Sequence, residues 1–251
     1  VEKYKKPKKL AKVAIVGKYV ELKDAYISIH ESIEHAGYNQ DTKVEITYIQ
    51  SEDYDVSTLS KYDGILVPGG FGDRGIEGKL DAIKFARENK IPFLGICLGM
   101  QTACIEFARN VLNYKDATST EFNENTNYPI ISLMTDQEDV VDLGGTMRLG
   151  AYPCVLKKES KAYDLYKKEL ISERHRHRYE FNNKFREDFE KNGMKIVGTS
   201  PDNKYVEVVE LENHPFFVAS QYHPEFKSRP DKPHPLFFGW VGAILELKEK
   251  N

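Results

Sequence analysis

The chain has 251 residues, 40% hydrophobic and 30% charged, and its 36 Lys and Arg against 39 Asp and Glu leave a net charge of −3. Its apolar runs are far shorter than the roughly 20 residues that a membrane span needs, and the near-neutral charge argues against a dedicated nucleic-acid-binding protein. We therefore expect one globular domain whose partners are small molecules or proteins, with neither nucleic acid nor membrane among them.

The chain begins with a lysine-rich stretch, VEKYKKPKKLAK, that precedes any apolar strand. It lacks the apolar core of a signal peptide. A solvated linker is the simplest interpretation, and a tether to nucleic acid or to a membrane is the alternative. Because the chain opens on Val1 and not on methionine, we expect a piece of a longer protein, with a basic interdomain linker at residues 1–11 and the domain at residues 12–251.

The first half of the chain alternates predicted strands and helices. Short runs rich in β-branched and apolar residues predict strands over residues 12–17, 44–49, 64–67 and 91–97. Apolar residues at helical spacing predict helices over residues 26–36 and 78–88. Continuous apolar strands with helices between them are typical of a doubly wound, mostly parallel sheet that is covered by helices on both faces, which is an α/β fold.

The second half is less regular. Residues 110–126 and 135–148 are polar and rich in turn formers, so we expect long loops there, and long ordered loops often carry function. Residues 195–199, 205–211 and 216–222 predict successive strands that extend the sheet in an antiparallel manner, and a final helix is predicted over residues 236–248.

Three cysteines, Cys97, Cys104 and Cys154, are too few and too scattered for a disulfide framework or a zinc cluster. We expect a reducing, cytoplasmic setting. We predict no metal site from these residues, and Cys104, inside a predicted helix, is interpreted as a core residue.

Cys97 lies in the sequence GICLG, between Gly95 and Gly99, where a predicted strand meets a predicted helix. A nucleophile on such a strained elbow needs small neighbours so that its side chain projects freely, and the following helix N-terminus favours the thiolate. We therefore predict an exposed nucleophilic sulfur. A buried cysteine at a strand end is the alternative.

Of the seven histidines, His223 has the most suggestive context, since it follows an apolar strand and precedes Pro224 and Glu225. In an extended backbone, residues 223 and 225 point to the same side, so Glu225 would orient the imidazole. Together with Cys97 these residues predict a Cys-His-Glu triad. His-Pro-Glu alone would suit an ordinary surface turn.

The sequence PGGFGDRG over residues 68–75 contains G-x-G-x-x-G, a pattern typical of dinucleotide-binding loops. That function also requires an acidic residue about 20 positions later, and residues 93–95 there are apolar. We favour a loop whose free amide near Gly70 forms an oxyanion hole with the amide of Leu98, and each such donor is worth roughly 3 kcal/mol.

The sequence RHRHR over residues 174–178 would, as a strand, place His175 and His177 on one face and the arginines on the other. A solvated strand is the default interpretation, and a metal-binding histidine pair or a polyanion-binding patch is the alternative. Because Arg178 borders Tyr179 and Phe181, it could also form the wall of a pocket, where a guanidinium pairs with a carboxylate.

These segments resemble the triad-type, or class I, glutamine amidotransferases. The resemblance rests on GICLGMQ at residues 95–101, PGGFGDRG at residues 68–75 and QYHPEF at residues 221–226. The match narrows to the glutaminase domain of the CTP synthase family through VGKY, STEF, GGTMRLG and RHRHRYE at residues 16–19, 119–122, 144–150 and 174–180. It implies a flavodoxin-like glutaminase fold with an antiparallel extension.

The resemblance also implies roles for single residues. Cys97 would attack the side-chain amide of L-glutamine, His223 would carry the proton, and Glu225 would steady His223. Ammonia and a glutamyl thioester would form, and water would release glutamate. The residues implied in glutamine binding are Gly70, Phe71, Leu98, Gly99, Met100, Gln101, Glu121 and Arg178. The residues implied in a lid that responds to GTP are Gly145, Thr146, Met147 and Arg148, for which a plain surface loop is the alternative.

In that family, ammonia passes to an N-terminal synthetase domain that aminates UTP to CTP with ATP and Mg²⁺, under activation by GTP, in a homo-tetrameric cytoplasmic enzyme. We find no Walker-type loop in this sequence and expect no cofactor in this domain. The alternatives are a γ-glutamyl hydrolase or cysteine peptidase on the same framework, and a catalytically silent regulatory or interaction domain.

Overall fold

The computed structural model describes residues 7–18, 23–133 and 147–250. The helices are α2 (Ile27–Asn39), α3 (Ile76–Glu88), α4 (Leu98–Asn110), α6 (Lys161–Tyr166), α7 (Arg186–Lys191) and α8 (Pro235–Lys250). The strands are β1 (Lys9–Gly17), β2 (Thr42–Gln50), β3 (Gly64–Val67), β4 (Phe93–Ile96), β5 (Thr118–Ser119), β6 (Pro129–Ser132), β7 (Arg148–Leu156), β8 (Leu170–His177), β9 (Glu180–Phe181), β10 (Met194–Thr199), β11 (Val206–Leu211) and β12 (Phe217–Ser220).

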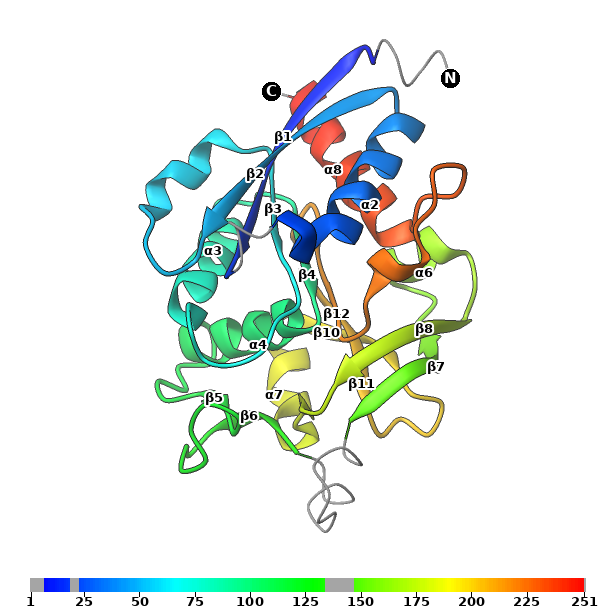
Figure 1. Ribbon diagram of the computed structural model, residues 1–251. Helices are drawn as coiled ribbons and strands as arrows, with labels where there is room; N and C mark the ends of the chain where they lie inside the picture. Colours follow the sequence, from blue (N-terminus) through cyan, green and yellow to red (C-terminus); the bar gives the residue numbers. More distant parts are fainter. Residues whose placement is uncertain (1–6, 19–22, 134–146, 251) are drawn as a thin grey trace.

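A nine-stranded sheet in the order β2-β1-β3-β4-β12-β11-β10-β7-β8 forms the centre of the molecule (Figure 1). The strands from β2 to β12 pair in parallel, in the order typical of flavodoxin-like folds. The strands from β12 to β8 pair antiparallel. The predicted α/β class, parallel core and antiparallel extension are confirmed.

Helices cover both faces of the parallel half, as the sequence predicts. Because successive side chains of a strand point to opposite faces, β3 sends Ile65 and Val67 into the core beneath α3 and α4, and Leu66 into the core beneath α2 and α8. The helices contribute apolar residues at helical spacing, such as Ile29 and Ile33 of α2. The two cores hold the strand ends rigidly where the candidate site lies.

A smaller sheet of β5, β6 and β9 lies beside α4 and carries the loop that follows β5. The sequence predicts only loops over residues 110–126, because strands of two residues leave no periodic pattern. The larger omission is β7, over which the sequence predicts no strand, and Arg148, at the end of the predicted loop, belongs to it. Antiparallel pairing with β8 holds this strand.

The N-terminal boundary also differs from the prediction. β1 begins at Lys9, because Lys9 to Ala11 pair in parallel with Thr42 to Val44 of β2. The predicted linker at residues 1–11 therefore overlaps a strand, and residues 1–6 lie outside the described part.

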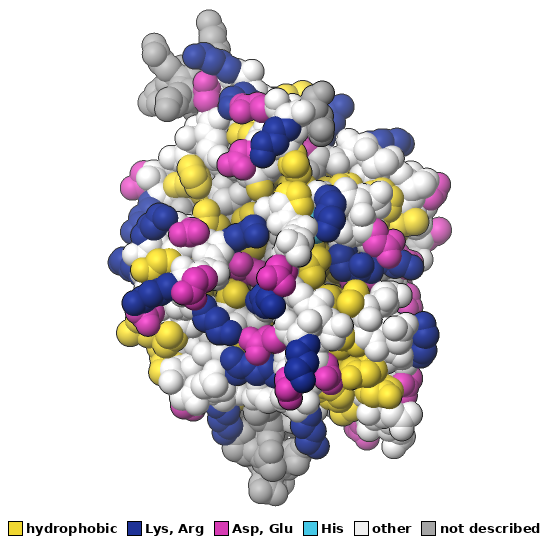
Figure 2. All heavy atoms as spheres, turned by 180° about the vertical axis from the view of Figure 1, so that it is seen from behind, with side chains coloured by type: hydrophobic (Ala, Val, Ile, Leu, Met, Phe, Trp, Pro, Cys, Tyr) yellow, Lys and Arg dark blue, Asp and Glu magenta, His cyan; other side chains and the backbone are white. Residues whose placement is uncertain are grey.

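The surface agrees with the composition. On the face in Figure 2, basic and acidic side chains are interspersed over the whole area. None of the described helices has the length and apolarity that a bilayer crossing requires.

Three neighbouring parallel strands, β3, β4 and β12, end at the same edge of the sheet. In open α/β sheets, ligands bind outside the carboxyl ends of the strands. The residues that follow these strands are Pro68 to Gly70, Cys97, and Gln221 to His223, so the topology brings the predicted site residues together.

Candidate active site

Cys97 is the single residue between β4 and α4, and its backbone has φ 53° and ψ −105°. A non-glycine residue in this conformation is strained by roughly 1–3 kcal/mol. Both flanking glycines are required by space: a Cβ on Gly99 would lie 2.1 Å from the backbone oxygen of Val67, and one on Gly95 would lie 2.9 Å from the Cβ of Ala219. The predicted elbow is present.

The sulfur of Cys97 is enclosed, since the residue is only 3% exposed. Its Sγ lies 3.9 Å from the carbonyl oxygen of Arg176 and 3.7 Å from Nε2 of Gln221. The prediction of an exposed sulfur is wrong in this respect, because β8 and the residues after β12 fold over the elbow. The sulfur faces a pocket instead of bulk solvent.

His223 and Glu225 form the expected pair, with Nδ1 of His223 2.7 Å from Oε1 of Glu225. The backbone N–H of His223 donates to the carbonyl of Arg174 at 2.8 Å, which ties the residue to β8. The predicted extended backbone is present at His223 but is wrong from Pro224 onward, because residues 224–227 form a 3₁₀ turn with Pro224 at its start. The turn, and not strand alternation, brings Glu225 back to the imidazole.

The imidazole of His223 lies beside Cys97. A Cβ on Gly69 would lie 2.9 Å from Cε1 of His223 and 3.5 Å from the Cβ of Cys97, so the bare backbone of Gly69 makes room for both side chains. Burial lowers the pKa of His223, but the negative charges of Cys97 and Glu225 outweigh burial and raise the pKa to about 10. The site therefore favours an imidazolium beside Cys97.

Backbone amides point to an oxyanion-binding function near the sulfur. Leu98 is the first residue of α4, where amides have no partner within the helix, and Gly70 lines the pocket in the loop after β3. A Cβ on Gly70 would lie 3.4 Å from the Leu98 side chain, so the two residues are neighbours. Within the described ranges, neither amide donates a hydrogen bond to the protein.

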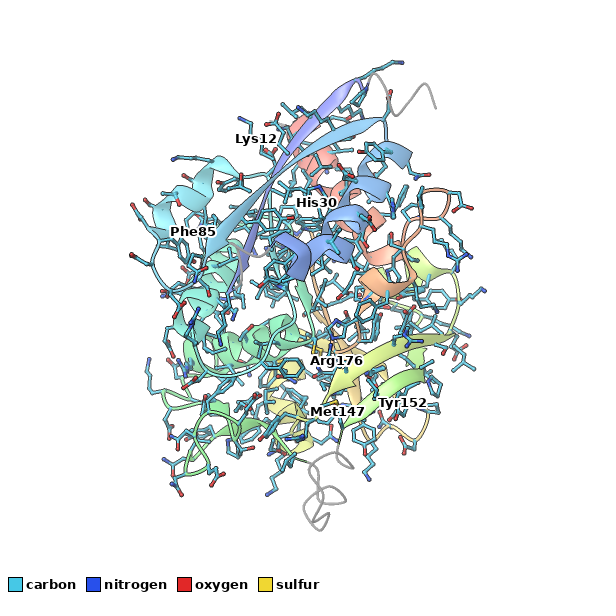
Figure 3. The ribbon with its side chains drawn as sticks, viewed as in Figure 1. Lys12, His30, Phe85, Met147, Tyr152 and Arg176 are labelled. Atoms are coloured by element: carbon cyan, nitrogen blue, oxygen red, sulfur yellow. The ribbon has the colours of Figure 1, made fainter. Side chains whose placement is uncertain are left out.

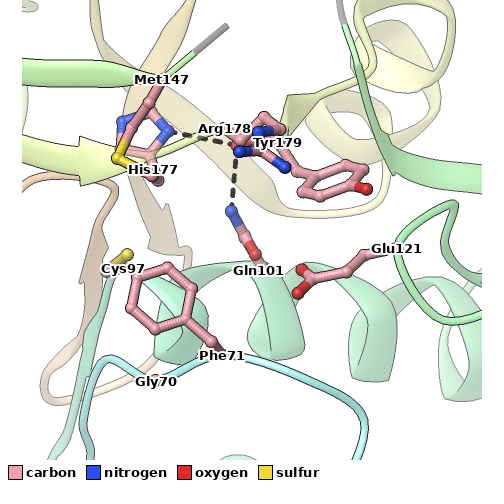
Figure 4. Close-up of a pocket in the computed structure, with 9 residues that line it drawn as sticks. All are labelled: Gly70, Phe71, Cys97, Gln101, Glu121, Met147, His177, Arg178 and Tyr179. Atoms are coloured by element: carbon pink, nitrogen blue, oxygen red, sulfur yellow. Dashed lines mark hydrogen bonds between the residues drawn. The ribbon is translucent and has the colours of Figure 1, made fainter. Parts of the chain in front are cut away.

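The pocket has a volume of about 100 Å³, which is below the roughly 300–1,000 Å³ typical of small-molecule sites. Its floor is the elbow and α4, and its roof is the end of β8 with the residues that follow (Figure 4). The lining residues are Gly70, Phe71, Cys97, Gln101, Glu121, Met147, His177, Arg178 and Tyr179.

The far end of the pocket carries one acidic and one basic side chain. Glu121, from the loop after β5, accepts a hydrogen bond from the amide of Gly72 at 3.2 Å, and Arg178 follows β8. Burial raises the pKa of Glu121, although the Gly72 amide and the charge of Arg178 oppose it. An ammonium and a carboxylate on one small ligand would match these two groups.

The alternation predicted for RHRHR is present, because His175 and His177 are buried whereas Arg174 and Arg176 are exposed. The default of a solvated strand is wrong for the histidine face. Nδ1 of His175 lies 2.8 Å from Nε2 of His177, and burial lowers the pKa of the two rings to about 2 and about 3. In the described part of the chain, no group of three or more candidate ligands could hold a metal ion.

The thiols of Cys104 and Cys154 and the guanidinium of Arg176 lie in different surroundings. Cys104 and Cys154 are buried, and burial raises the pKa of both thiols. Figure 3 shows Met147 and Arg176 in the lower half of the view, whereas His30 lies in the upper half, on α2. The guanidinium of Arg176 lies 5.8 Å from the ring centroid of Phe71, a residue that lines the pocket.

Three residues that the sequence predicts to bind glutamine, Leu98, Gly99 and Met100, do not line the pocket. Met100 is fully buried in the core and its amide donates to the carbonyl of Cys97, and Gly99 packs on Val67. Leu98 is buried too, and it is not among the residues that line the pocket. The structure therefore offers no pocket-lining side chain at Gly99 or Met100 for the predicted glutamine binding.

The predicted lid lies only partly within the described residues. Gly145 and Thr146 fall outside them, and Met147 lines the pocket. Arg148 is the first residue of β7, and its guanidinium forms buried ion pairs with Glu180 at 3.1 Å and Glu207 at 2.8 Å. These bonds make Arg148 a fixed part of the sheet, so a loop position is wrong for this residue.

Sequence reasoning missed three residues near the sulfur or in the pocket. The sequence indicates His177 only as half of a histidine pair and Tyr179 only as a neighbour of Arg178, although both line the pocket. It predicts no role for Gln221 within QYHPEF, yet the amide of this residue reaches the sulfur. Its place directly after an apolar strand beside His223 is the one local signal that could have indicated it.

Comparison with known families agrees with this geometry. The family model described as glutamine amidotransferase class-I matches residues 21–242. The chain belongs to the class I glutamine amidotransferases. Among them it is similar to the CTP synthase of Clostridium beijerinckii, 61% identical over 250 residues, and to that of Fibrobacter succinogenes, 59% identical over 255 residues. These matches cover 98% and 100% of the chain but 47% and 45% of the relatives, so the chain spans about half their length.

A similar solved structure indicates which kind of class I amidotransferase the chain is. It is described as the glutaminase domain of Trypanosoma brucei CTPS with bound acivicin. The identity is 37%, each chain is covered to 94%, and the TM-score is 0.89. This amidotransferase is therefore a glutaminase domain of the CTP synthase type.

Proposed function

We propose that the chain hydrolyses L-glutamine to glutamate and ammonia through Cys97, His223 and Glu225. The observation that carries this proposal is the elbow: a strained cysteine beside a glutamate-bound histidine, below a pocket with one acidic and one basic side chain. This arrangement combines a nucleophile, a proton carrier and groups that match a free amino acid.

The chemistry follows from the charges of the site. The thiolate of Cys97 attacks the side-chain amide carbon of glutamine, and the new oxyanion receives hydrogen bonds from the amides of Gly70 and Leu98. The imidazolium of His223 gives its proton to the departing nitrogen, which leaves as ammonia. His223 then removes a proton from water, which attacks the thioester and releases glutamate and the thiolate. Glu225 stabilises the imidazolium in both steps.

Substrate binding is proposed for the polar end of the pocket. Arg178 would pair with the α-carboxylate and Glu121 with the α-ammonium, while Gly70, Phe71 and Gln101 line the space between. The backbone at Leu98 and Gly99 would contribute amides only. We propose no contact for Met100, since it lies in the core.

For the whole protein, we propose that the ammonia serves the amination of UTP to CTP by a synthetase domain. The similarity to CTP synthases supports this, and ATP, Mg²⁺, GTP activation and a homo-tetramer belong to the same proposal. The GTP-responsive lid stays a proposal for residues 145–147, two of which lie outside the described part. A cytoplasmic location is proposed with it.

Labelling with acivicin, the compound bound by the Trypanosoma brucei relative, tests the proposal directly. We expect one adduct, on Cys97, and loss of glutamate production in step with labelling. Cys97→Ala should lose at least about 10⁴-fold in kcat, as expected on removal of a nucleophile. Adducts on Cys104 or Cys154, or undiminished activity of Cys97→Ala, would overturn it.

The alternative functions would give different results in the same assays. A γ-glutamyl hydrolase or a peptidase would cleave γ-glutamyl or peptide substrates in preference to glutamine. A silent interaction domain would release no ammonia and would bind acivicin without an adduct.

A further inference from the structure

Two buried glutamine side chains connect the roof of the pocket to the catalytic sulfur. Nε2 of Gln101 donates to the carbonyl of Tyr179 at 3.0 Å and to Oε1 of Gln221 at 3.2 Å. Nε2 of Gln221 then lies 3.7 Å from Sγ of Cys97. Gln221 is 0% exposed and Gln101 is 4% exposed, so water does not compete for these bonds.

The chain of bonds fixes which end of each amide faces its neighbour. The carbonyl of Tyr179 can only accept, so the NH₂ group of Gln101 must point to it. The second hydrogen of that NH₂ group points to Gln221, which must present its oxygen. The NH₂ group of Gln221 is thereby directed at the sulfur, where it can only donate.

Three polar groups lie against the sulfur: the imidazole of His223, the carbonyl of Arg176 and the amide of Gln221. His223 is the titratable group among them, and its charged form favours a thiolate, whereas the other two groups favour opposite protonation states. The carbonyl of Arg176, 3.9 Å away, can accept a hydrogen bond only from the neutral thiol. The amide of Gln221 donates, and donation to a charged sulfur is stronger than donation to a neutral one. Gln221 does not line the pocket, so it has no direct route to the substrate.

We propose that Gln221 is a positioning residue that holds the sulfur of Cys97 as a thiolate aimed at the pocket, with Gln101 locking its amide in the donating orientation. This inference rests on the proposed glutaminase function, because it assigns a role within that site. The backbone of Gln221 is itself fixed, since its N–H donates to the carbonyl of Glu207 at 2.8 Å.

The test uses Gln221→Met, which keeps the length of the side chain but removes the donor. The rate of Cys97 alkylation by iodoacetamide is measured against pH with mass-spectrometric mapping, alongside kcat and KM for glutamine. We expect the alkylation midpoint to rise by about one pH unit, so that labelling below it is about tenfold slower. kcat should fall about tenfold with KM nearly unchanged.

Two further variants make the result specific. Gln221→Leu also removes the donor and adds no charge beside the sulfur, so its midpoint should rise as far, and it replaces Gln221→Met in the test if Gln221→Met does not fold. Gln50→Met is the matched control for the same replacement at a distant position on β2, where the amide bonds Glu52. Its midpoint should equal that of the wild type.

An unchanged midpoint in both Gln221 variants would overturn the inference, whatever happens to kcat. So would a rise in KM with an unchanged midpoint, which would indicate a merely structural role. Failure of the proposed function looks different: the wild-type chain would release no ammonia from glutamine, while the alkylation midpoints would still decide the role of Gln221.

Discussion

The two halves of the central sheet contribute to the site in different ways. In the parallel half, β3, β4 and β12 are adjacent and end at one edge, and each is followed by one chemical group: the glycine loop, the nucleophile or the histidine. In the antiparallel half, neighbouring strands end at opposite edges, and β8 alone ends in the pocket, followed by Arg178. We infer that the parallel half performs the chemistry and the antiparallel half supplies the wall that selects the substrate.

Gly99→Ala should cause the largest loss, because it damages the parallel half itself. The new Cβ would lie 2.1 Å from the backbone oxygen of Val67, so β3 and α4 would have to separate. We expect a free energy of unfolding lower by about 3 kcal/mol or more, together with loss of glutaminase activity. Urea denaturation followed by far-UV circular dichroism measures the first effect.

The matched control is Gly242→Ala in α8, where a Cβ would meet only the flexible end of Gln40, at 3.1 Å. Alanine is favoured over glycine in a helix, so this variant should be as stable as the wild type or slightly more stable. Equal destabilisation by the two variants would contradict the role assigned to the elbow.

Replacement of Cys97 by alanine tests the electrostatic interaction between Cys97 and His223 in the parallel half. The pKa of His223 is raised to about 10 by Cys97 and Glu225 against the effect of burial. In Cys97→Ala, burial opposes Glu225 alone, so the pKa should fall by more than about one unit. NMR titration of labelled histidines measures it, and His214, whose pKa burial lowers to about 4, should not change.

The sign of the accompanying stability effect follows from the raised pKa. Folding favours the protonated ring, so the contribution of His223 is fully present below its ordinary pKa of 6.5 and is lost as pH rises through about 10. In Cys97→Ala this loss should occur at lower pH. A His223 titration that is unchanged in Cys97→Ala would show that the sulfur carries no charge beside the ring.

The same contrast explains how much of the molecule the sequence predicts. β3, β4 and the second half of β1 are buried on both faces and read as apolar runs, so these strands and the residues at their ends could be located from the sequence. The edge strand β2 is only partly buried, and its β-branched residues indicated it instead. The position of Arg178 could be suggested but not fixed, because β7 is interrupted by Gly150 and Pro153 and its pairing with β8 is a long-range contact. Gln221 could not be assigned, since its role depends on a bond to Gln101, 120 residues away.

Arg178→Ala should weaken substrate binding by the antiparallel half and leave the catalytic step nearly unchanged. If Arg178 binds the α-carboxylate of glutamine, its loss should raise KM roughly 10- to 100-fold and change kcat much less. Arg178→Lys, which keeps the charge but not the planar fork, should fall between these values. Arg174→Ala is the control, because Arg174 is exposed on β8, the strand that Arg178 follows, and its backbone bond to His223 survives the replacement. A fall in kcat with unchanged KM would place Arg178 in the chemistry and remove the distinction between the halves.

Glu121→Gln should have the smallest effect and should show it as a change in pH dependence. The replacement keeps an acceptor for the amide of Gly72 and removes only the charge, so KM should rise several-fold at neutral pH. Because burial raises the pKa of Glu121, the wild-type carboxylate becomes protonated at a higher pH than an exposed one would, and the wild-type KM should increase as the pH falls. The KM of Glu121→Gln should stay nearly constant over the same range, so the two curves should converge on the acid side. Parallel curves would mean that Glu121 does not bind the α-ammonium, and the loop after β5 would then only shape the pocket.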